Sequence, residues 1–342
     1  MEMVLIDTIE GWEKLEKNWG ELLKKSIRPY PFLEYWYLRT WWESLGGGEW
    51  QQDESSLRIV AGYQDGTLKA VAPLFLSKQA GKAPAYHFIG QTDVTDYLDF
   101  IASGGDFKNF LSDLLFFLLK RDQPEAASLD LANLQSDSPS LPVLEELCAA
   151  MGFQYRAQVL QPAPSILLPS SWETFLENLS KKQRHEVRRK ERNVERDFET
   201  DLVFVDGRQD IESELRDFVG MMRNEQEKME FLTPEREAFM IALGKHAHEH
   251  GLLGLTWLTL NGKKAAGYFN FLTQNRLWVY NTGWNPEFGK VSPGWVLLVK
   301  IIQWAIENGL EEVDLMRGDE EYKYRFGAQD REVVQVLIGL PQ

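Results

Sequence analysis

Tyr280-Asn281-Thr282-Gly283, followed after five residues by Gly289-Lys290-Val291-Ser292-Pro293-Gly294-Trp295, is the most informative stretch of this 342-residue chain. We predict a strand that ends at Gly283 and a helix with Ser292 as N-cap and Pro293 at its first position. Unpaired N–H groups at such a helix start, beside glycines, form a typical phosphate or pyrophosphate site. An ordinary capped loop has the same pattern, so both interpretations stay open. A nucleoside-triphosphatase P-loop is disfavoured because Val291 follows Lys290, where Ser or Thr is needed.

A second candidate segment follows the next expected strand, at 312–315. Its sequence is Asp314-Leu315-Met316-Arg317-Gly318-Asp319-Glu320-Glu321-Tyr322-Lys323-Tyr324-Arg325-Phe326-Gly327, which is dense in acids, bases and phenols. Open α/β sheets bind ligands at the carboxyl ends of their strands. A solvated charged loop has a similar composition, but the position after a strand favours a functional loop.

The rest of the chain predicts an α/β fold with a mixed sheet, in which the same order of elements occurs twice. Each half contains a strand pair joined by a two-residue hairpin signal, Asp65-Gly66 or Asn261-Gly262. The Gln161-Pro162-Ala163-Pro164 stretch breaks both periodicities, so we expect domains at 1–163 and 164–342. The expected helices cover 10–25, 33–42, 107–121, 138–151, 172–198, 211–228, 234–250 and 293–308. The expected strands cover 57–63, 68–77, 97–102, 128–131, 153–159, 202–205, 252–260, 264–272, 277–284 and 312–315.

Composition excludes several classes of protein. With 37 Lys and Arg against 52 Asp and Glu, the net charge of −15 repels nucleic acid and anionic lipid, which disfavours DNA binding. The lone Cys148 excludes an internal disulfide framework and suits a reducing compartment. Met1 to Asp7 lacks the pattern of a secretion signal, and the apolar runs are far shorter than the ~20 residues that span a bilayer. We therefore expect a soluble cytoplasmic protein without membrane insertion.

A basic segment and a histidine cluster each allow two interpretations. The segment contains Lys181, Lys182, Arg184, Arg188, Arg189, Lys190, Arg192 and Arg196. It suits steering of an anionic ligand such as CoA, a nucleotide sugar, tRNA or an acidic glycan. Glu186, Glu191 and Glu195 lie at pairing distance, which slightly favours a salt-bridged exposed helix. His246 and His250 are placed in the last turn of a helix, where cationic groups are favourable. We expect no metal site there, because the His-Glu-x-x-His pattern is missing.

The order of these segments resembles that of the CelD/BcsL-type acetyltransferases, a branch of the GNAT superfamily that is related to the FemAB transferases. In this branch two GNAT-like halves are fused, and the resemblance covers nearly the whole chain. It rests on Asp96-Tyr97-Leu98-Asp99-Phe100, the helix from Leu179 to Arg192, the helix start Ser292-Pro293-Gly294 and, most specifically, Asp314-Leu315-Met316-Arg317-Gly318-Asp319-Glu320 with Tyr322-Lys323.

The resemblance implies two tandem GNAT-like domains, of which the first is degenerate, and an acyl-CoA co-substrate such as acetyl-CoA. The pyrophosphate of CoA would lie at the backbone N–H groups of Val291 to Trp295, and its pantetheine beside the strand near Tyr280. The usual Gln/Arg-x-x-Gly-x-Gly/Ala loop is replaced here by Lys290-Val291-Ser292-Pro293-Gly294. An aminoacyl donor carried by tRNA, as in FemAB relatives, therefore stays open, and so does a catalytically silent binding module.

Direct acyl transfer needs a base for the acceptor, donors for the oxyanion and an acid for the departing thiolate. By chemical type, we assign the base to Asp319 or Glu320, and we expect Tyr322 to be either the acid or a phenol that positions the acceptor. The expected ligand-binding and orienting residues are Arg317 and Lys323 for an anionic group, Asp314 for the loop, and Asp96, Tyr97, Asp99 and Arg184 for the acceptor. The resemblance suggests an acceptor amine or hydroxyl on a sugar or on an envelope or exopolysaccharide precursor.

Overall fold

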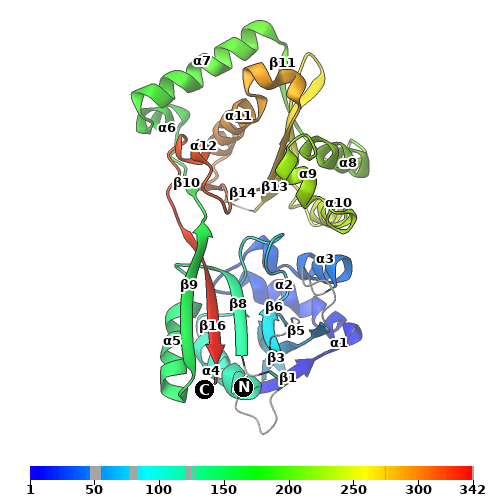
Figure 1. Cartoon of the computed structure of the whole chain (residues 1–342), viewed down its shortest axis with the longest axis vertical. Helices are drawn as coiled ribbons and strands as arrows, with labels where there is room; N and C mark the ends of the chain where they lie inside the picture. The colour runs from blue at the N-terminus through cyan, green and yellow to red at the C-terminus, as the bar shows by residue number, and fades with distance from the viewer. Residues whose placement is uncertain (47–54, 78–82, 120–124, 127, 274, 341–342) are drawn as a thin grey trace. The chain divides into compact units, whose positions relative to one another are not determined.

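The computed structural model describes residues 1–46, 55–77, 83–119, 125–126, 128–273 and 275–340. The chain forms two compact units (Figure 1). Unit 1 comprises Met1–Gln161 and Arg331–Gln342, and unit 2 comprises Pro162–Asp330. The expected second domain, 164–342, differs from unit 2 at its end, because the last strand of the chain belongs to the sheet of unit 1.

Unit 1 contains two sheets and a core rich in aromatic side chains. The four-stranded sheet has the order β1 (Glu2–Ile6), β3 (Ile59–Gln64), β4 (Thr67–Ala72), β7 (Ile101–Ala102). The six-stranded sheet has the order β2 (Ser56–Leu57), β5 (Leu74–Ser77), β6 (Ala85–Phe88), β8 (Ser128–Gln135), β16 (Glu332–Gly339), β9 (Gln154–Pro162). The helices are α1 (Ile9–Glu13), α2 (Glu16–Lys24), α3 (Tyr35–Leu45), α4 (Phe107–Leu119) and α5 (Ser140–Met151), with a 3₁₀ turn at Pro31–Leu33. Residues 120 and 121 of the helix expected at 107–121 lie outside the described residues.

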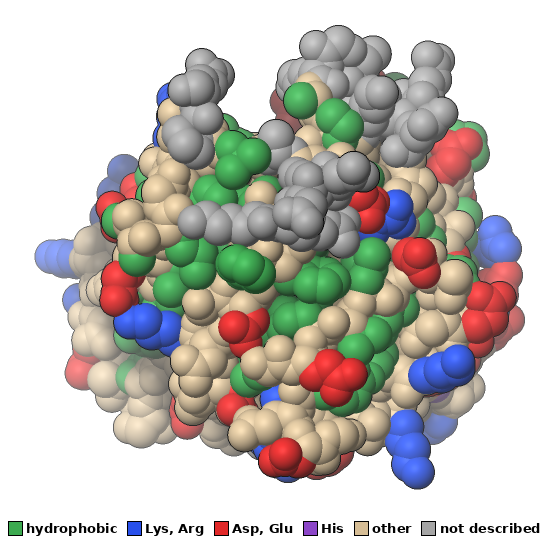
Figure 2. All heavy atoms as spheres, turned by 90° about the horizontal axis from the view of Figure 1, so that it is seen from below, with side chains coloured by type: hydrophobic (Ala, Val, Ile, Leu, Met, Phe, Trp, Pro, Cys, Tyr) green, Lys and Arg blue, Asp and Glu red, His purple; other side chains and the backbone are tan. Residues whose placement is uncertain are grey.

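The surface of unit 1 is mixed in character. Figure 2 looks onto one end of this unit and shows hydrophobic side chains among acidic ones, with Lys and Arg near the margin of the face.

Cys148 is buried in α5, where burial raises the pKa of its thiol to about 11. This thiol is therefore a core group and is protonated at neutral pH.

Unit 2 is built on one six-stranded mixed sheet. The order is β10 (Ser165–Leu167), β15 (Glu312–Asp314), β14 (Arg276–Trp284), β13 (Lys263–Leu272), β12 (Thr256–Leu260), β11 (Thr200–Phe204). The helices are α6 (Trp172–Asn178), α7 (Lys181–Asp197), α8 (Ile211–Met222), α9 (Gln226–Phe231), α10 (Pro234–Glu249), α11 (Pro293–Glu307) and α12 (Glu321–Tyr324), with a 3₁₀ turn at Pro286–Val291. Figure 1 shows α7 and α11 on one side of this sheet and α8, α9 and α10 on the other.

Local sequence signals account for the turns and for one helix boundary. Asp65 and Gly66 have φ of 51° and 71°, and Asn261 and Gly262 have φ of 50° and 74°. Two successive positive φ values are the requirement of the type I′ hairpin turn, so both hairpin predictions are confirmed. The helices expected over 172–198 are α6 and α7, and the boundary between them is set by Ser180, which caps α7 in a reciprocal capping box with Gln183.

Helix α11 forms the centre of the unit 2 core. Nine of its fifteen residues are buried, and its apolar side chains pack into one cluster with β12, β13, β14 and β15. Within the described part of the chain, no helix is both long and apolar enough to cross a membrane. The hydrophobicity of α11 is therefore explained by burial between the sheet and α7.

Strands β14 and β15 pair over only part of their length. Their parallel ladder joins Arg276–Trp278 to Glu312–Asp314, whereas β14 continues to Trp284. β15 ends at Asp314, and the chain turns at Met316, which has a φ of 60°. The edge of β14 from Val279 onward therefore has no strand beside it in the described residues.

Candidate functional site

A pocket of about 330 Å³ in unit 2 brings together residues from both candidate segments. It lies where the end of β14, the start of α11 and the side chains of α7 and α12 meet. Its lining residues are Lys190, Glu225, Tyr268, Thr282, Gly283, Trp284, Ser292, Gly294, Trp295 and Tyr322. A larger hollow of about 420 Å³ lies in unit 1, but its lining, which includes Asn18, Lys25 and Lys69, contains none of the predicted site residues.

The start of α11 presents unbonded amides to this pocket. Ser292 is the N-cap residue, but it has φ of 53° and ψ of 60° and its hydroxyl makes no cap hydrogen bond. Its own N–H donates to the carbonyl of Gly289. Pro293 has no N–H, so the first available donors are the amides of Gly294 and Trp295, for which the described residues offer no hydrogen-bond acceptor. These two amides lie within the range Val291 to Trp295, for which the sequence predicts an anion site.

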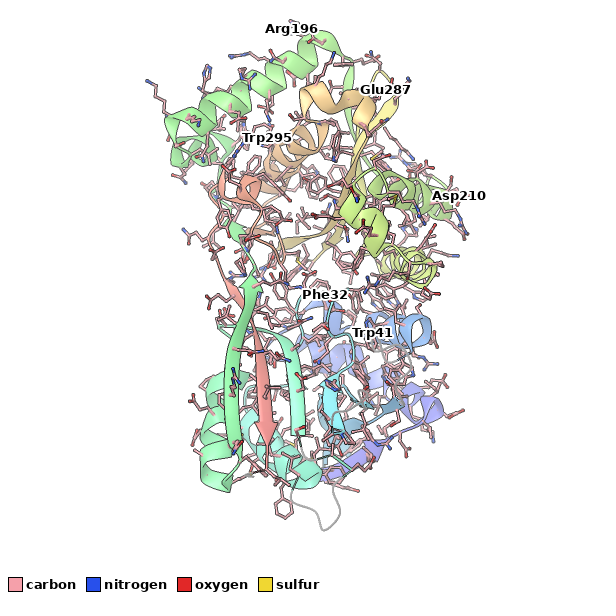
Figure 3. All side chains as sticks on the ribbon, viewed as in Figure 1. Phe32, Trp41, Arg196, Asp210, Glu287 and Trp295 are labelled. Atoms are coloured by element: carbon pink, nitrogen blue, oxygen red, sulfur yellow. The ribbon has the colours of Figure 1, made fainter. Side chains whose placement is uncertain are left out.

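The side chain of Trp295 faces α7 and carries a cation over its ring. Nζ of Lys190 lies 4.4 Å from the ring centroid and 3.5 Å from Oε1 of Glu186. Figure 3 labels Trp295 at the start of α11, on the side of α7, and Arg196 near the far end of α7. Burial lowers the pKa of the Lys190 ammonium, although Glu186 acts in the opposite direction. Sequence analysis placed Lys190 in the basic segment but did not place it in the site.

Two tyrosines define another wall of the pocket. Tyr268 donates from its hydroxyl to the carbonyl of Gly294 at 3.2 Å. Burial strongly raises the pKa of Tyr322, and the nearby carboxylates of Glu320 and Glu225 raise it further. The phenol of Tyr322 is therefore protonated throughout the neutral range and is able to donate a proton, which is the role predicted for it.

Glu225 is a pocket residue that sequence analysis missed. It lies at the N-cap position of α9, and its Oε1 accepts a hydrogen bond from Nζ of Lys228 at 2.8 Å. The same ammonium donates to the carbonyl and the hydroxyl of Thr282 in β14, at 2.7 and 2.9 Å. Local sequence patterns only weakly indicate this arrangement, since Glu225 falls inside the helix predicted over 211–228, which the structure divides into α8 and α9.

Lys323 has a different role from the predicted one. Its side chain is 3% exposed, and its Nζ donates to the carbonyls of Met316, Arg317 and Gly318 at 3.2, 2.8 and 3.4 Å. It also lies 2.9 Å from Oε2 of Glu320. An ammonium enclosed in this way is not available to an anionic ligand, so Lys323 fixes the loop rather than binding substrate.

The other residues of the acidic loop lie around the pocket rather than in it. Asp314 is fully buried, and its Oδ1 accepts from the backbone N–H of Met316 at 2.9 Å, which fits the loop-orienting role considered for it. Asp319 and Glu320 are exposed, and neither they nor Arg317 line the pocket. The structure therefore does not bring the predicted base into the pocket.

Two cofactor-site predictions also lie beside the pocket. The ring of Tyr280 packs against Phe269 and Phe271, with ring centroids 5.4 and 5.2 Å apart. Lys290 is exposed in the 3₁₀ turn before α11, and it does not line the pocket. Ser292, Gly294 and Trp295 are the predicted donor-binding residues that the pocket brings together.

The acceptor residues predicted in the first half are part of the core of unit 1. Tyr97 and Asp99 are fully buried, and Asp96 is 8% exposed. Asp99 accepts hydrogen bonds from the hydroxyls of Ser138 and Ser140 and from the N–H of Phe100. Burial raises the pKa of Asp99, whereas these bonds act in the opposite direction. The carboxylate is thus occupied inside unit 1, which argues against contact with an acceptor.

In unit 1, this buried segment lies next to β6. The corresponding position next to β14 in unit 2 contains no strand in the described residues. The parallel pair β6 and β8 is joined only at Ala85–Ser128 and Tyr86–Leu129. Beyond that point, the N–H of Leu98 donates to the carbonyl of Asn133, and Nδ2 of Asn133 donates to the carbonyls of Thr92 and Thr95. The end of β8 is therefore occupied by this segment of the same chain.

Helix α7 contains acids that form ion pairs and a group of exposed bases that form none in the described part of the chain. Glu186 pairs with Lys190, and Glu195 lies 3.2 Å from Nζ of Lys300 in α11. Arg184 donates to the carbonyl of Leu176 at 3.3 Å, so it covers the end of α6 instead of an acceptor. No ion pair is formed within the described residues by the exposed bases Lys181, Lys182, Arg188, Arg189 and Arg192. The interpretation of α7 as a salt-bridged exposed helix therefore holds in part: Glu186–Lys190, Glu195–Lys300 and Arg196–Asp197 are paired, whereas these five bases are not paired with any residue that the structure describes.

Comparisons with known proteins identify a matching domain family and similar folds. Residues 181–324 match the model of the acetyltransferase (GNAT) domain family. No curated protein sequence matched the chain. Among solved structures, FemX is 12% identical with a TM-score of 0.69, covering 100% of this chain and 98% of FemX.

Two further structures are similar over nearly their whole length. The C-terminal domain of a putative lysylphosphatidylglycerol synthetase from Agrobacterium fabrum is 13% identical with a TM-score of 0.56, covering 96% of this chain and 92% of that one. A tandem GNAT protein from the clavulanic acid biosynthesis pathway is 12% identical with a TM-score of 0.51, covering 100% of both chains. The chain thus folds as two GNAT-like domains in tandem, and residues 181–324 match the acetyltransferase (GNAT) domain family.

Proposed function

We propose that unit 2 transfers an acyl group from acyl-CoA to an amine or hydroxyl acceptor. One observation carries this proposal: the same pocket joins the unbonded amides of Gly294 and Trp295 to the protonated phenol of Tyr322. Amides at a helix start suit a diphosphate, and a phenol close by suits a departing thiolate.

The residues present fit the chemical groups of CoA. The amides of Gly294 and Trp295 and the ammonium of Lys190 would bind its pyrophosphate, since all three present positive or partially positive groups at the pocket. The end of β14 borders the pocket at Thr282, Gly283 and Trp284, so pantetheine would lie beside this strand. Tyr322 would then donate its proton to the sulfur as the thioester bond breaks.

The acceptor and the cellular setting remain part of the proposal. The Asp314–Glu320 motif supports the CelD/BcsL branch, in which an acceptor sugar or an envelope or exopolysaccharide precursor is expected. The single cysteine and the use of acyl-CoA favour the cytoplasm. A small or glycan-precursor acceptor fits a pocket of about 330 Å³.

A second candidate is aminoacyl transfer from charged tRNA, as in the FemAB transferases. The outward bases of α7 favour it, because they form a cationic face in a protein of net charge −15. The similarity to FemX, at 12% identity, supports the fold and leaves the donor open. A binding module without turnover is the third possibility.

A ligand-dependent unfolding experiment separates these candidates. Acetyl-CoA at a hundred times its dissociation constant is expected to stabilise the native state by about 2.7 kcal/mol, which raises the thermal midpoint by a few degrees. Transfer is followed as free thiol released from acetyl-CoA in the presence of amino sugars, amino acids and polyamines. The absence of any shift, together with tRNA binding that weakens with salt, favours the second candidate. A shift without turnover favours the third.

A further inference from the structure

The lining of the pocket in unit 2 contains a single carboxylate, that of Glu225. The carboxylates first considered for the base are elsewhere: Asp319 and Glu320 are exposed and do not line the pocket, and Glu320 is paired with Lys323. Resting on the proposed acyl transfer, we propose that Glu225 is the general base that accepts the proton of the acceptor.

Backbone packing places Glu225 beside the donor strand. Gly283 of β14 lies against the end of α8, and a Cβ added there would meet the N of Met222 at 3.1 Å and the C of Met221 at 3.3 Å. The side chain of Asn224 donates to the carbonyl of Trp284 at 3.1 Å. A glycine at 283 thus allows β14 to approach the junction of α8 and α9, where Glu225 lies.

The Glu225 carboxylate is held on one side and accessible on the other. Lys228 occupies Oε1 at 2.8 Å and is itself fixed by Thr282, so the orientation of the carboxylate is tied to β14. The described residues donate no hydrogen bond to Oε2, and the side chain is 35% exposed. A carboxylate with one anchored and one free oxygen has the arrangement that a general base needs.

The charged and titratable groups around Glu225 come from four elements. Lys228 belongs to α9, Lys190 to α7, Tyr268 to β13 and Tyr322 to α12. The two phenols are neutral at physiological pH because burial raises their pKa. The pocket therefore places the carboxylate of Glu225 together with a protonated donor, Tyr322.

The proposed acyl transfer balances in protons and in bonds. A proton of the acceptor amine or hydroxyl moves to Glu225 while the acceptor nitrogen or oxygen bonds to the carbonyl carbon of the thioester. The carbon–sulfur bond breaks, and the sulfur takes the proton of Tyr322. Glu225 then releases its proton to solvent and Tyr322 regains one, leaving the acylated acceptor and free CoA thiol.

The test compares Glu225→Gln with Glu227→Gln in the full-length chain. Glu227 lies on the same helix but is exposed and does not line the pocket. Glu225→Gln should lower kcat by about 100-fold or more, because the amide cannot accept the proton of the acceptor. Glu227→Gln should match the wild type. The thermal shift caused by acetyl-CoA should persist in both variants.

Chemical rescue separates a base from a structural residue. Glu225→Ala should regain activity with added sodium formate, because the small carboxylate replaces the missing base, whereas a structural defect would not respond. A Glu225→Gln variant with wild-type rate and pH profile would overturn the assignment while leaving the acyltransferase intact. A wild-type protein that binds no acetyl-CoA and acylates no amino sugar, amino acid or polyamine would overturn both.

Discussion

The ammonium of Lys323 lies beneath the loop that follows β15 and donates to the carbonyls of Met316, Arg317 and Gly318. Gly318 itself has a φ of 117°, and a Cβ there would lie 2.4 Å from Oε2 of Glu320. The loop therefore depends on a buried lysine and on a glycine at one position. This charged motif therefore contains a residue that holds the loop in place, Lys323, beside a residue with a proposed chemical role, Tyr322.

Replacing Lys323 with methionine should destabilise the protein by about 3 kcal/mol, because three carbonyls and one carboxylate lose a charged donor. Urea unfolding monitored by tryptophan fluorescence provides the measurement. Lys290→Met is the matched control, since Lys290 is exposed, and its effect should stay within about 0.5 kcal/mol. Equal stabilities of the two variants would contradict the structural role of Lys323.

Tyr322 provides a test of the acid. Its pKa is raised above the ordinary phenol value by burial, so the protonated form persists to higher pH than in a free tyrosine. Tyr322→Phe should lower kcat about 100-fold with little change in acetyl-CoA affinity. The wild-type rate should show no loss from phenol ionisation up to about pH 10. A variant that keeps the full rate would remove Tyr322 from the proposed chemistry.

At the scale of elements, α7 and α11 share an interface that contains acids. Burial raises the pKa of Glu191, while Lys300 lowers it and Glu195 raises it. The native state therefore holds this proton more tightly than the unfolded state, and stability is lost as pH rises from the ordinary carboxyl range through the native pKa. The charge on Glu191 is thus a cost at neutral pH.

Glu191→Gln should raise the urea midpoint at pH 7, because the neutral amide avoids the desolvation of a charge. The gain should vanish below about pH 4, where Glu191 is protonated in both states. Glu195→Gln serves as the comparison, since Glu195 is exposed and paired with Lys300, so its replacement should not stabilise. A gain that is the same at both pH values would contradict the titration of Glu191.

The conformation of Ser292 links the strand to the helix start. Its φ of 53° is unfavourable for residues other than glycine, asparagine or aspartate and is especially poor for β-branched ones. Ser292→Gly should leave the stability unchanged or slightly higher, whereas Ser292→Val should destabilise by about 1–2 kcal/mol. The valine variant should also bind acetyl-CoA more weakly, because this turn orients the amides of Gly294 and Trp295. Thermal unfolding with and without acetyl-CoA measures both effects.

Elements that are encoded by local sequence signals could be predicted, whereas only some of the residues that line the pocket could. Two-residue turns and the start of α11 are encoded by neighbouring residues, and Tyr322 follows its strand closely. The positions of Glu225 and Lys190 depend on how β14 and α11 pack against other helices, which no short-range pattern records. The burial of Asp99 by Ser138 and Ser140 was hidden for the same reason, because its partners lie 39 and 41 residues away.

At the scale of the whole molecule, the end of the chain belongs to its beginning. Strand β16 lies between β8 and β9 in the six-stranded sheet of unit 1, and its register with β8 runs from Val333–Gln135 to Gly339–Ser128. Buried side chains of this strand, including Val333, Val336 and Ile338, contribute to the core of unit 1. The elements next to β16 in the sequence are not strands of this sheet. Its central position in the sheet of unit 1 was therefore not predictable from local periodicity.

Deleting residues 331–342 should therefore damage unit 1 rather than unit 2. Hydrogen exchange should show lost protection in β8 and β9, whose ladder partner is missing, while β13 and β14 keep theirs. The intact chain measured under the same conditions is the control. Retained protection of β8 after the deletion would show that β16 is dispensable for that sheet.

The position of β16 also determines the order in which the protein is completed during synthesis. A ribosome releases residues 162–330 before it releases the strand that unit 1 needs, so the later domain has its full sequence first. The earlier domain must wait with an unfilled gap between β8 and β9. Such a gap exposes strand edges that attract other chains, and nascent copies are consequently prone to aggregate until β16 has been synthesised.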